Sequence, residues 1–192
     1  KRCRYDTFIE EMRMPDQLFL FDTQENTSFL TEQLITYIGS KRALLRFIGT
    51  AIEKVKERLG KERLKTADLF SGSGIVARFL KQYSEKLTVN DLETYTEVIN
   101  RCYLANKREL DITYLTEVYQ RIEHVLKNGP LSDGIISTLY APSDDTNIQP
   151  GERVFYTKRN ARFLDTARQI IETLPPEISP YFLAPLLSEA SI

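Results

Sequence analysis

A short glycine-rich segment has the residue types and spacing best suited to chemistry. It reads Asp68-Leu-Phe-Ser-Gly72-Ser-Gly74 and lies between an apolar run and a helical pattern. Glycines at such a turn let a ligand approach the backbone, and the following helix offers unpaired N–H groups to an anionic or polar group. Gly72-x-Gly74-x-x-Ala77 also fits the loose dinucleotide fingerprint, so the loop alone is compatible with a nicotinamide or flavin enzyme, or with a turn that binds nothing.

A carboxylate follows the next expected strand. Asp91 lies 19 residues after Gly72, in the string Asn90-Asp91-Leu92-Glu93. An offset of about twenty residues is where an acidic side chain meets ribose hydroxyls in nucleoside-binding folds. Aspartate is also a common helix N-cap, and the two roles are compatible. We therefore predict that Asp91 holds a ribose, caps the next helix, or does both.

A third segment lies upstream, where Tyr37-Ile-Gly39-Ser40-Lys41 precedes a basic helical pattern. A lysine in a first helical turn opposes the helix dipole, which favours an anion nearby, although a surface lysine there costs only about a few tenths of a kcal/mol. Lys41 is thus a candidate for a ligand carboxylate or a phosphate. For Tyr37 and Phe70, core packing explains the residue type as well as a pocket role does.

The order of the periodic segments predicts an α/β fold that positions these residues. A helix is expected from Ser40 to Leu59, ending at Gly60 and facing a core, because its apolar residues recur every three to four positions. A strand over 66–70, a helix over 75–80, a strand over 86–90 and a helix over 92–106 follow. This alternation implies a parallel sheet covered by helices.

The alternation stops near residue 110. Helices are predicted over 112–126, 160–174 and 180–190, and residues 140–151 have the composition of a loop. We therefore expect three parts: an N-terminal arm (1–33), a binding α/β core (34–110), and a helical and loop region (111–192) that is a candidate target-recognition insert.

Composition excludes several classes of protein. The length of 192 residues suits one domain of ordinary size or one domain with a helical annex, and a share of 42% hydrophobic and 28% charged residues indicates a folded chain. Its longest apolar runs have four residues, too few to cross a membrane. With Cys3, Cys102 and His124 as its whole set of cysteines and histidines, we expect no disulfide framework, no metal site and a reducing, cytoplasmic location. The start at Lys1 indicates a processed or excised product.

Charge is unevenly distributed along the chain. Residues 40–66 hold nine basic and three acidic side chains, and the rest of the chain holds 17 basic and 24 acidic ones. A phosphate-facing edge produces such a pattern, and a solvated helix with ion pairs explains it equally well.

Taken together and in this order, the three segments resemble motifs of the Dam-like (alpha) class of DNA adenine methyltransferases, in particular the type IIS restriction-modification methylases. The family's Y-x-G-S-K, D-L-F-x-G-x-G and N-D-x-E patterns are similar to residues 37–41, 68–74 and 90–93. The resemblance covers residues 34–106 and, more loosely, 156–165. It implies a Rossmann-like S-adenosylmethionine-dependent methyltransferase fold, with methyl transfer from S-adenosylmethionine to a flipped-out adenine in double-stranded DNA.

The resemblance also implies which residues bind the cofactor: Tyr37, Lys41, Asp68, Phe70, Gly72, Gly74 and Asp91. Asp68 would anchor the methionine end and Asp91 the ribose. Tyr37 and Lys41 would close the pocket, with Lys41 facing the cofactor carboxylate or DNA.

The chain departs from the family in one respect. Methyl transfer to adenine requires a D-P-P-Y-type motif that binds the exocyclic amine and stacks on the base. No such motif occurs, and the nearest string, Ser179-Pro180-Tyr181-Phe182, has tyrosine in place of the second proline. We therefore name no catalytic residue. We expect an N-terminal portion of a longer enzyme, inactive alone, with a C-terminal catalytic portion or a cognate restriction endonuclease as candidate partner.

Two alternatives stay open. The chain could be a non-catalytic partner subunit that contributes cofactor or DNA contacts to a separate methyltransferase chain. A Rossmann oxidoreductase fits less well, because Asp68, just before the loop, would face a pyrophosphate.

Overall fold

The computed structural model describes residues 34–35, 39 and 41–190, so Tyr37 and Ser40 lie outside the described residues. The described residues fall into two compact units, 34–110 and 111–190. Within these residues, no helix has the length and apolar character needed to span a bilayer.

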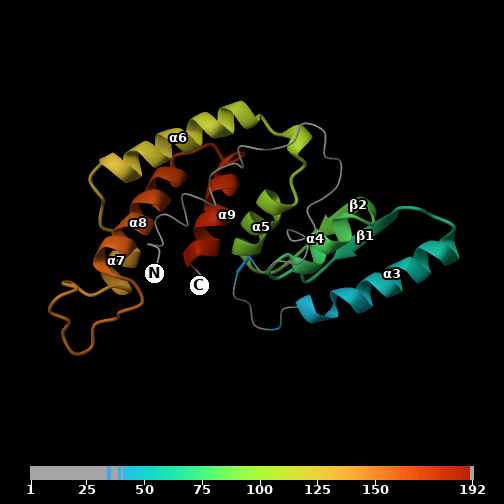
Figure 1. Ribbon diagram of the computed structural model, residues 1–192, viewed down its shortest axis with the longest axis horizontal. Coiled ribbons are helices and arrows are strands. Elements are labelled where there is room, and N and C mark those ends of the chain that lie inside the picture. Colours follow the sequence, from blue (N-terminus) through green and yellow to red (C-terminus); the bar gives the residue numbers. More distant parts are fainter. Residues whose placement is uncertain (1–33, 36–38, 40, 191–192) are drawn as a thin grey trace. The chain divides into compact units, whose positions relative to one another are not determined.

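The first unit contains the predicted alternation of strands and helices (Figure 1). Its elements are η1 (Arg42–Leu44), α3 (Leu45–Leu59), β1 (Leu64–Asp68), α4 (Ile75–Lys81), β2 (Ser84–Val89), α5 (Thr94–Tyr103) and η2 (Lys107–Glu109). Each expected helix and strand is present, and α3 ends as predicted at Gly60, whose φ is +62°. The expectation of an α/β fold is thus confirmed.

The strands β1 and β2 form a parallel ladder, with Leu64 opposite Ser84 and Asp68 opposite Val89. Both strands begin two residues earlier than predicted. Leu64 stands between charged residues and Ser84 is itself polar, so the sequence did not indicate that these two residues are buried. Since the strands run in the same direction, Asp68 and the residues that follow Val89 meet at one edge of the sheet.

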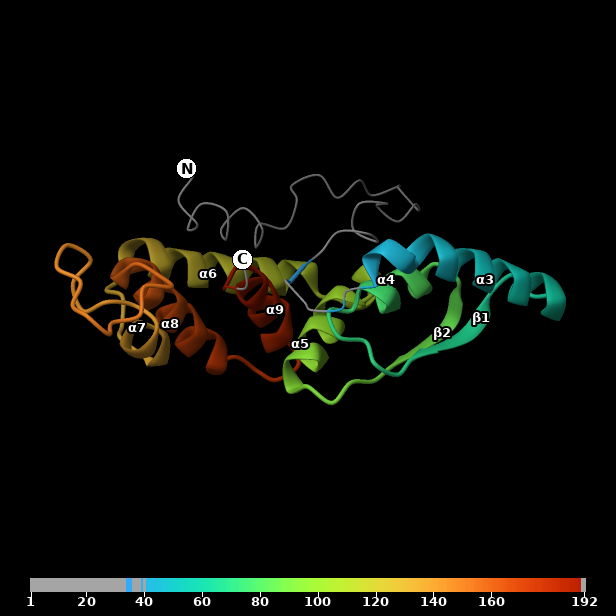
Figure 2. The same ribbon diagram turned by 90° about the horizontal axis from the view of Figure 1, so that it is seen from below.

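Helix α3 differs from the expectation that it faces a core. Only Leu45 and Gly49 are buried, whereas Phe47 is 73% exposed. The helix packs against α4 through Gly49, which lies beside Phe79, and the Lys56 ammonium lies 5.5 Å from the centre of the Tyr83 ring. In Figure 2, α3 and α4 lie on the same side of the two strands. Leu45, Ile48, Gly49, Ile52 and Lys56 are the residues of α3 that are not fully exposed, and its apolar residues Val55 and Leu59 are left exposed, as is Leu44 just before it.

The second unit is helical, as predicted for this region. It contains α6 (Ile112–Asn128), α7 (Ile135–Leu139), α8 (Lys158–Glu172) and α9 (Ser179–Ala190), and α8 packs against the other three helices. The buried stripe of α6 is the expected one, made of Leu115, Val118, Tyr119, Ile122 and Leu126. The sequence did not predict α7.

Candidate functional site

Asp68 ends β1 at the carboxyl edge of the sheet. Burial raises the pKa of its carboxyl above the ordinary value; the N–H groups of Phe70 and Ala77 oppose the rise, Asp91 adds to it and Lys41 lowers it. Its Oδ2 atom is buried and makes no hydrogen bond among the described residues. A buried acceptor without a donor is costly, so this carboxylate favours a cationic or donor group brought by a ligand.

The loop after Asp68 is a tight turn closed by backbone hydrogen bonds. Ser71 N–H donates to the Asn90 carbonyl at 3.1 Å, and Gly74 N–H donates to the Ser71 carbonyl at 2.8 Å. Gly72 and Gly74 have φ values of +50° and +72°, in the left-handed region that other residues rarely adopt. The glycine spacing read from the sequence is therefore a requirement of the turn.

Asp91 joins this loop to the end of β2. Its Oδ2 accepts from Gly72 N–H at 2.7 Å and its Oδ1 accepts from Glu93 N–H at 3.1 Å. These amides, Gly72 first, hold the pKa of Asp91 below its ordinary value. The N-cap of α5 is Glu93, whose side chain makes no capping bond, so the predicted N-cap role for Asp91 is wrong. Asp91 instead fastens the glycine loop.

The other predicted site residues are placed differently. Lys41 is exposed and donates to the Gly39 carbonyl at 3.0 Å, near enough to Asp68 to affect its pKa. Phe70 is 88% exposed. The structure thus brings Asp68, the two loop glycines and Asp91 together, places Lys41 within electrostatic range, and says nothing of Tyr37, which lies outside the described residues.

Two asparagines at the loop were not predicted as site residues. Asn90 Nδ2 donates to the Leu69 carbonyl at 3.2 Å, and Asn100 Nδ2 donates to Ser71 Oγ at 2.9 Å. Asn100 lies on the inward side of α5, next to the buried Ile99. A polar side chain beside the buried stripe of an amphipathic helix was the signal that could have identified it.

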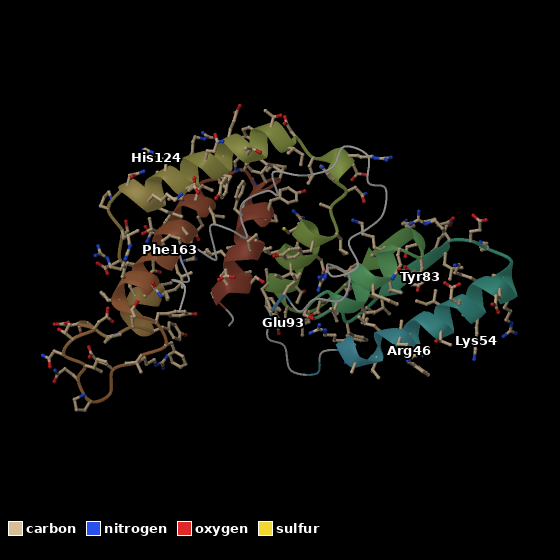
Figure 3. All side chains as sticks on the ribbon, viewed as in Figure 1. Arg46, Lys54, Tyr83, Glu93, His124 and Phe163 are labelled. Carbon is tan, nitrogen blue, oxygen red and sulfur yellow. The ribbon has the colours of Figure 1, made fainter. Side chains whose placement is uncertain are left out.

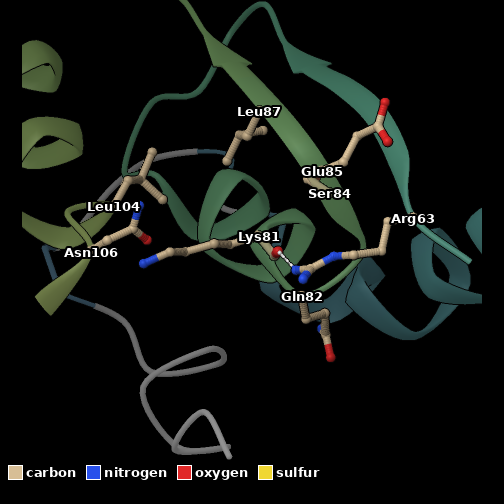
Figure 4. Close-up of a pocket in the computed structure, with 8 residues that line it drawn as sticks. All are labelled: Arg63, Lys81, Gln82, Ser84, Glu85, Leu87, Leu104 and Asn106. Carbon is tan, nitrogen blue, oxygen red and sulfur yellow. Dashed lines mark hydrogen bonds between the residues drawn. The ribbon is translucent and has the colours of Figure 1, made fainter. Parts of the chain in front are cut away.

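Two hollows in the first unit lie away from these residues. One, of about 620 Å³, lies at the start of β2, where the Arg63 guanidinium donates to the Lys81 carbonyl (Figure 4). The other, of about 540 Å³, lies between α3 and α4 and is lined in part by Arg46, Lys54 and Tyr83, which Figure 3 labels. None of the predicted site residues lines either hollow.

The charged groups around the glycine loop are suited to binding a ligand. Burial raises the pKa of the Cys102 thiol to about 12, so it stays protonated and is a poor nucleophile. No group of three or more potential metal ligands occurs among the described residues. Asp68 and Asp91 flank a loop with positive-φ glycines, an arrangement suited to a ligand that carries both a cation and hydroxyl groups.

Comparison with known proteins identifies the family. The model of the D12 class N6 adenine-specific DNA methyltransferases matches residues 37–184, which include all three motifs. The chain is 31% identical over 138 residues to Type II methyltransferase M.NlaIII of Neisseria lactamica, covering 72% of this chain and 38% of that protein. It is 29% identical over 163 residues to Type II methyltransferase M.CviAII of Paramecium bursaria Chlorella virus 1, covering 81% of this chain and 45% of that protein.

The chain therefore spans less than half the length of these two relatives. No solved structure matches it. The family model extends through both units, and it confirms the resemblance drawn from the three motifs. The chain belongs to the D12 class N6 adenine-specific DNA methyltransferase family.

Proposed function

We propose that the whole protein transfers a methyl group from S-adenosylmethionine to the N6 atom of adenine in double-stranded DNA, as part of a restriction-modification system. Residues 34–110 supply the cofactor site within a Rossmann-like fold. The observation that carries this proposal is the convergence of Asp68, Gly72, Gly74 and Asp91 at the carboxyl edge of two parallel strands. Ligands of open parallel sheets bind at this edge.

The residues fit the chemistry of the cofactor. S-adenosylmethionine, when bound, supplies an electrophilic methyl group on a sulfonium, and it also carries an ammonium, a carboxylate and ribose hydroxyls. Asp68 Oδ2 is buried and has no hydrogen-bond partner in the described part of the chain, which suits the ammonium. Each Asp91 oxygen accepts one backbone N–H and keeps a second lone pair, so Asp91 can accept ribose hydroxyls while it fastens the loop.

Lys41 and Phe70 complete the proposed site. The Lys41 ammonium is exposed and electrostatically coupled to Asp68, which suits the cofactor carboxylate or a DNA phosphate. The exposed Phe70 ring lies two residues after Asp68, where it can cover a bound nucleoside. Tyr37 remains a predicted member of the pocket.

The residues that act on adenine are proposed to lie in the part of the protein beyond these 192 residues. Ser179–Phe182 is no substitute, because it forms the first turn of α9. We propose that residues 111–190 belong to the region that recognises the target. The oxidoreductase alternative is wrong, since the family is one of DNA methyltransferases.

Methylation by the natural full-length protein tests the proposal. Purified protein is incubated with duplex DNA and methyl-labelled S-adenosylmethionine, and the DNA is hydrolysed to nucleosides. N6-methyladenine is the expected product. Label on cytosine, or no label, would contradict the proposal. Label that appears only after a second chain is added would instead support the partner-subunit alternative.

A further inference from the structure

Asn100 is a polar side chain of α5 that hydrogen-bonds to the glycine loop. It lies in the same stretch of helix as Thr96 and Ile99, which are 2% and 1% exposed. Its Nδ2 donates to Ser71 Oγ at 2.9 Å. The backbone N–H and carbonyl of Ser71 are already bonded, to Asn90 and Gly74 respectively, so Asn100 adds a side-chain bond to the residue from which the turn begins.

Asn100 also restricts the other end of the turn. A Cβ on Gly74 would lie 2.8 Å from Asn100 Oδ1 and 3.7 Å from Ile99 Cγ2. The amide oxygen thus occupies the space that a side chain at position 74 would need. That oxygen is buried and makes no hydrogen bond among the described residues. Burying an unbonded amide oxygen is unfavourable. We therefore infer that the contacts of Asn100 with the loop offset this cost in free energy.

We propose that Asn100 is a positioning residue for cofactor binding: its amide holds Ser71 and blocks Gly74, so that the loop keeps the turn in which Gly72 N–H meets Asp91. This inference rests on the proposed function, because it takes the loop as the S-adenosylmethionine site. Asn100 contacts Ser71 and Gly74 of the loop, so its proposed effect on cofactor binding is indirect and depends on the conformation of the loop.

Three variants of the full-length protein test the proposal. Asn100→Ala removes the support, Ser71→Ala removes the same hydrogen bond from the loop side while leaving α5 intact, and the double variant closes a mutant cycle. Asn106→Ala is the control, because this exposed amide donates to the exposed Glu109 at 3.0 Å and no hydrogen bond between described residues joins it to the glycine loop. If the two residues act through one hydrogen bond, the KM of the double variant for S-adenosylmethionine is no higher than that of the more impaired single variant.

The first readout is kinetic. Each single variant is expected to raise the KM for S-adenosylmethionine by about tenfold, with a smaller change in kcat and an unchanged KM for DNA. Asn106→Ala is expected to match the wild type. A KM for S-adenosylmethionine that stays at the wild-type value in both single variants overturns the proposal.

The second readout needs no ligand and separates this proposal from the proposed function. Hydrogen exchange is followed by mass spectrometry in peptides that span residues 68–77. Asn100→Ala and Ser71→Ala should speed exchange of the Gly74 amide by about tenfold, because its bond to Ser71 opens more often. If the wild type does not bind S-adenosylmethionine but exchange is faster in the variants, the proposed function fails and the support role stands. Unchanged exchange in both variants overturns the support role.

Discussion

At the scale of single residues, Asp68 and Asp91 are carboxylates whose surroundings shift their pKa values in opposite directions. Burial raises the pKa of Asp68, and the amides of Gly72 and Glu93 lower that of Asp91. Asp68 is therefore an unfavourable charge in the ligand-free protein, whereas Asp91 is a stabilised one. This difference predicts different effects for the two mutations.

For Asp68→Asn we predict weaker cofactor binding without loss of stability. A cationic ligand needs the carboxylate, so wild-type affinity should fall as pH drops through the raised pKa of Asp68, and the Asn variant should show a flatter profile. Because the folded protein binds this proton more tightly than the unfolded chain, the Asp68 charge costs stability as pH rises, and Asn removes that cost. Calorimetric titration with S-adenosylmethionine, started near the ordinary aspartate pKa of about 3.9 and continued upward in pH, measures the affinity, and melting curves over the same range measure the stability. A melting temperature well below the wild type would contradict the assignment.

Asp91→Ala should weaken cofactor binding by about 1–3 kcal/mol, because it frees Gly72 N–H and removes the proposed ribose acceptor. Asp91→Asn keeps one acceptor oxygen for one of the two backbone amides, so its affinity should be intermediate. The stability that the lowered pKa gives is present above the ordinary aspartate range and is lost as pH falls through the folded pKa. Titration of the wild type and both variants with S-adenosylmethionine shows whether affinity falls from wild type to Asp91→Asn to Asp91→Ala. Equal affinities for the wild type and Asp91→Ala would exclude Asp91 from the site.

The sequence predicted that the glycine loop and Asp91 lie at this part of the site, but not which residues hydrogen-bond to one another. Glycine spacing and the offset to Asp91 placed the loop and the carboxylate, because those features follow from local turn geometry and from parallel strands. It could not predict that Asp91 bonds Gly72 or that Asn100 holds Ser71, since each contact joins residues that are 19 or more positions apart.

At the scale of elements, the buried Asp165 fixes the short helix α7. It is 1% exposed and accepts from Ile136 N–H at 3.0 Å and Ser137 N–H at 2.7 Å. Asp165→Ala should therefore leave two amides unsatisfied and lower the free energy of unfolding by about 1–3 kcal/mol for each amide that stays buried. Urea unfolding followed by circular dichroism measures the loss.

The control for this prediction is Asp145→Ala. Asp145 accepts from Lys158 N–H at 2.9 Å, but this bond is exposed and water can replace it. Its loss should cost less than that of Asp165. Equal losses in the two variants would mean that α7 does not depend on the buried carboxylate.

Helices with a long apolar period were predictable, and α7 was not. The stripe of α6 repeats over 17 residues, and Asp111 caps its start by accepting from Tyr114 N–H. In contrast, α7 has five residues, too few to show a period, and its first turn is held by Asp165 from α8. Its existence depends on tertiary contacts that a local pattern does not contain.

At the scale of the whole molecule, the first unit leaves much apolar surface uncovered. Among the described residues the sheet has two strands, and parallel sheets are normally covered on both faces. The large apolar side chains exposed in this unit are Leu44, Val55, Leu59, Phe47, Leu69, Phe70 and Leu92. Apolar surface of this kind favours association in water.

We therefore predict that the 192-residue chain, prepared alone, associates with itself as its concentration rises and binds a hydrophobic dye. The variant Phe47→Ser with Val55→Ser should reduce both effects, because both apolar side chains are exposed on α3, at 73% and 46% exposure. Its melting temperature should change little, since neither residue is buried. Lys54→Ser, on the same helix, is the control and should leave association unchanged. Sedimentation velocity measures the association, and a monomer at every concentration would show that the exposed apolar side chains have no such effect.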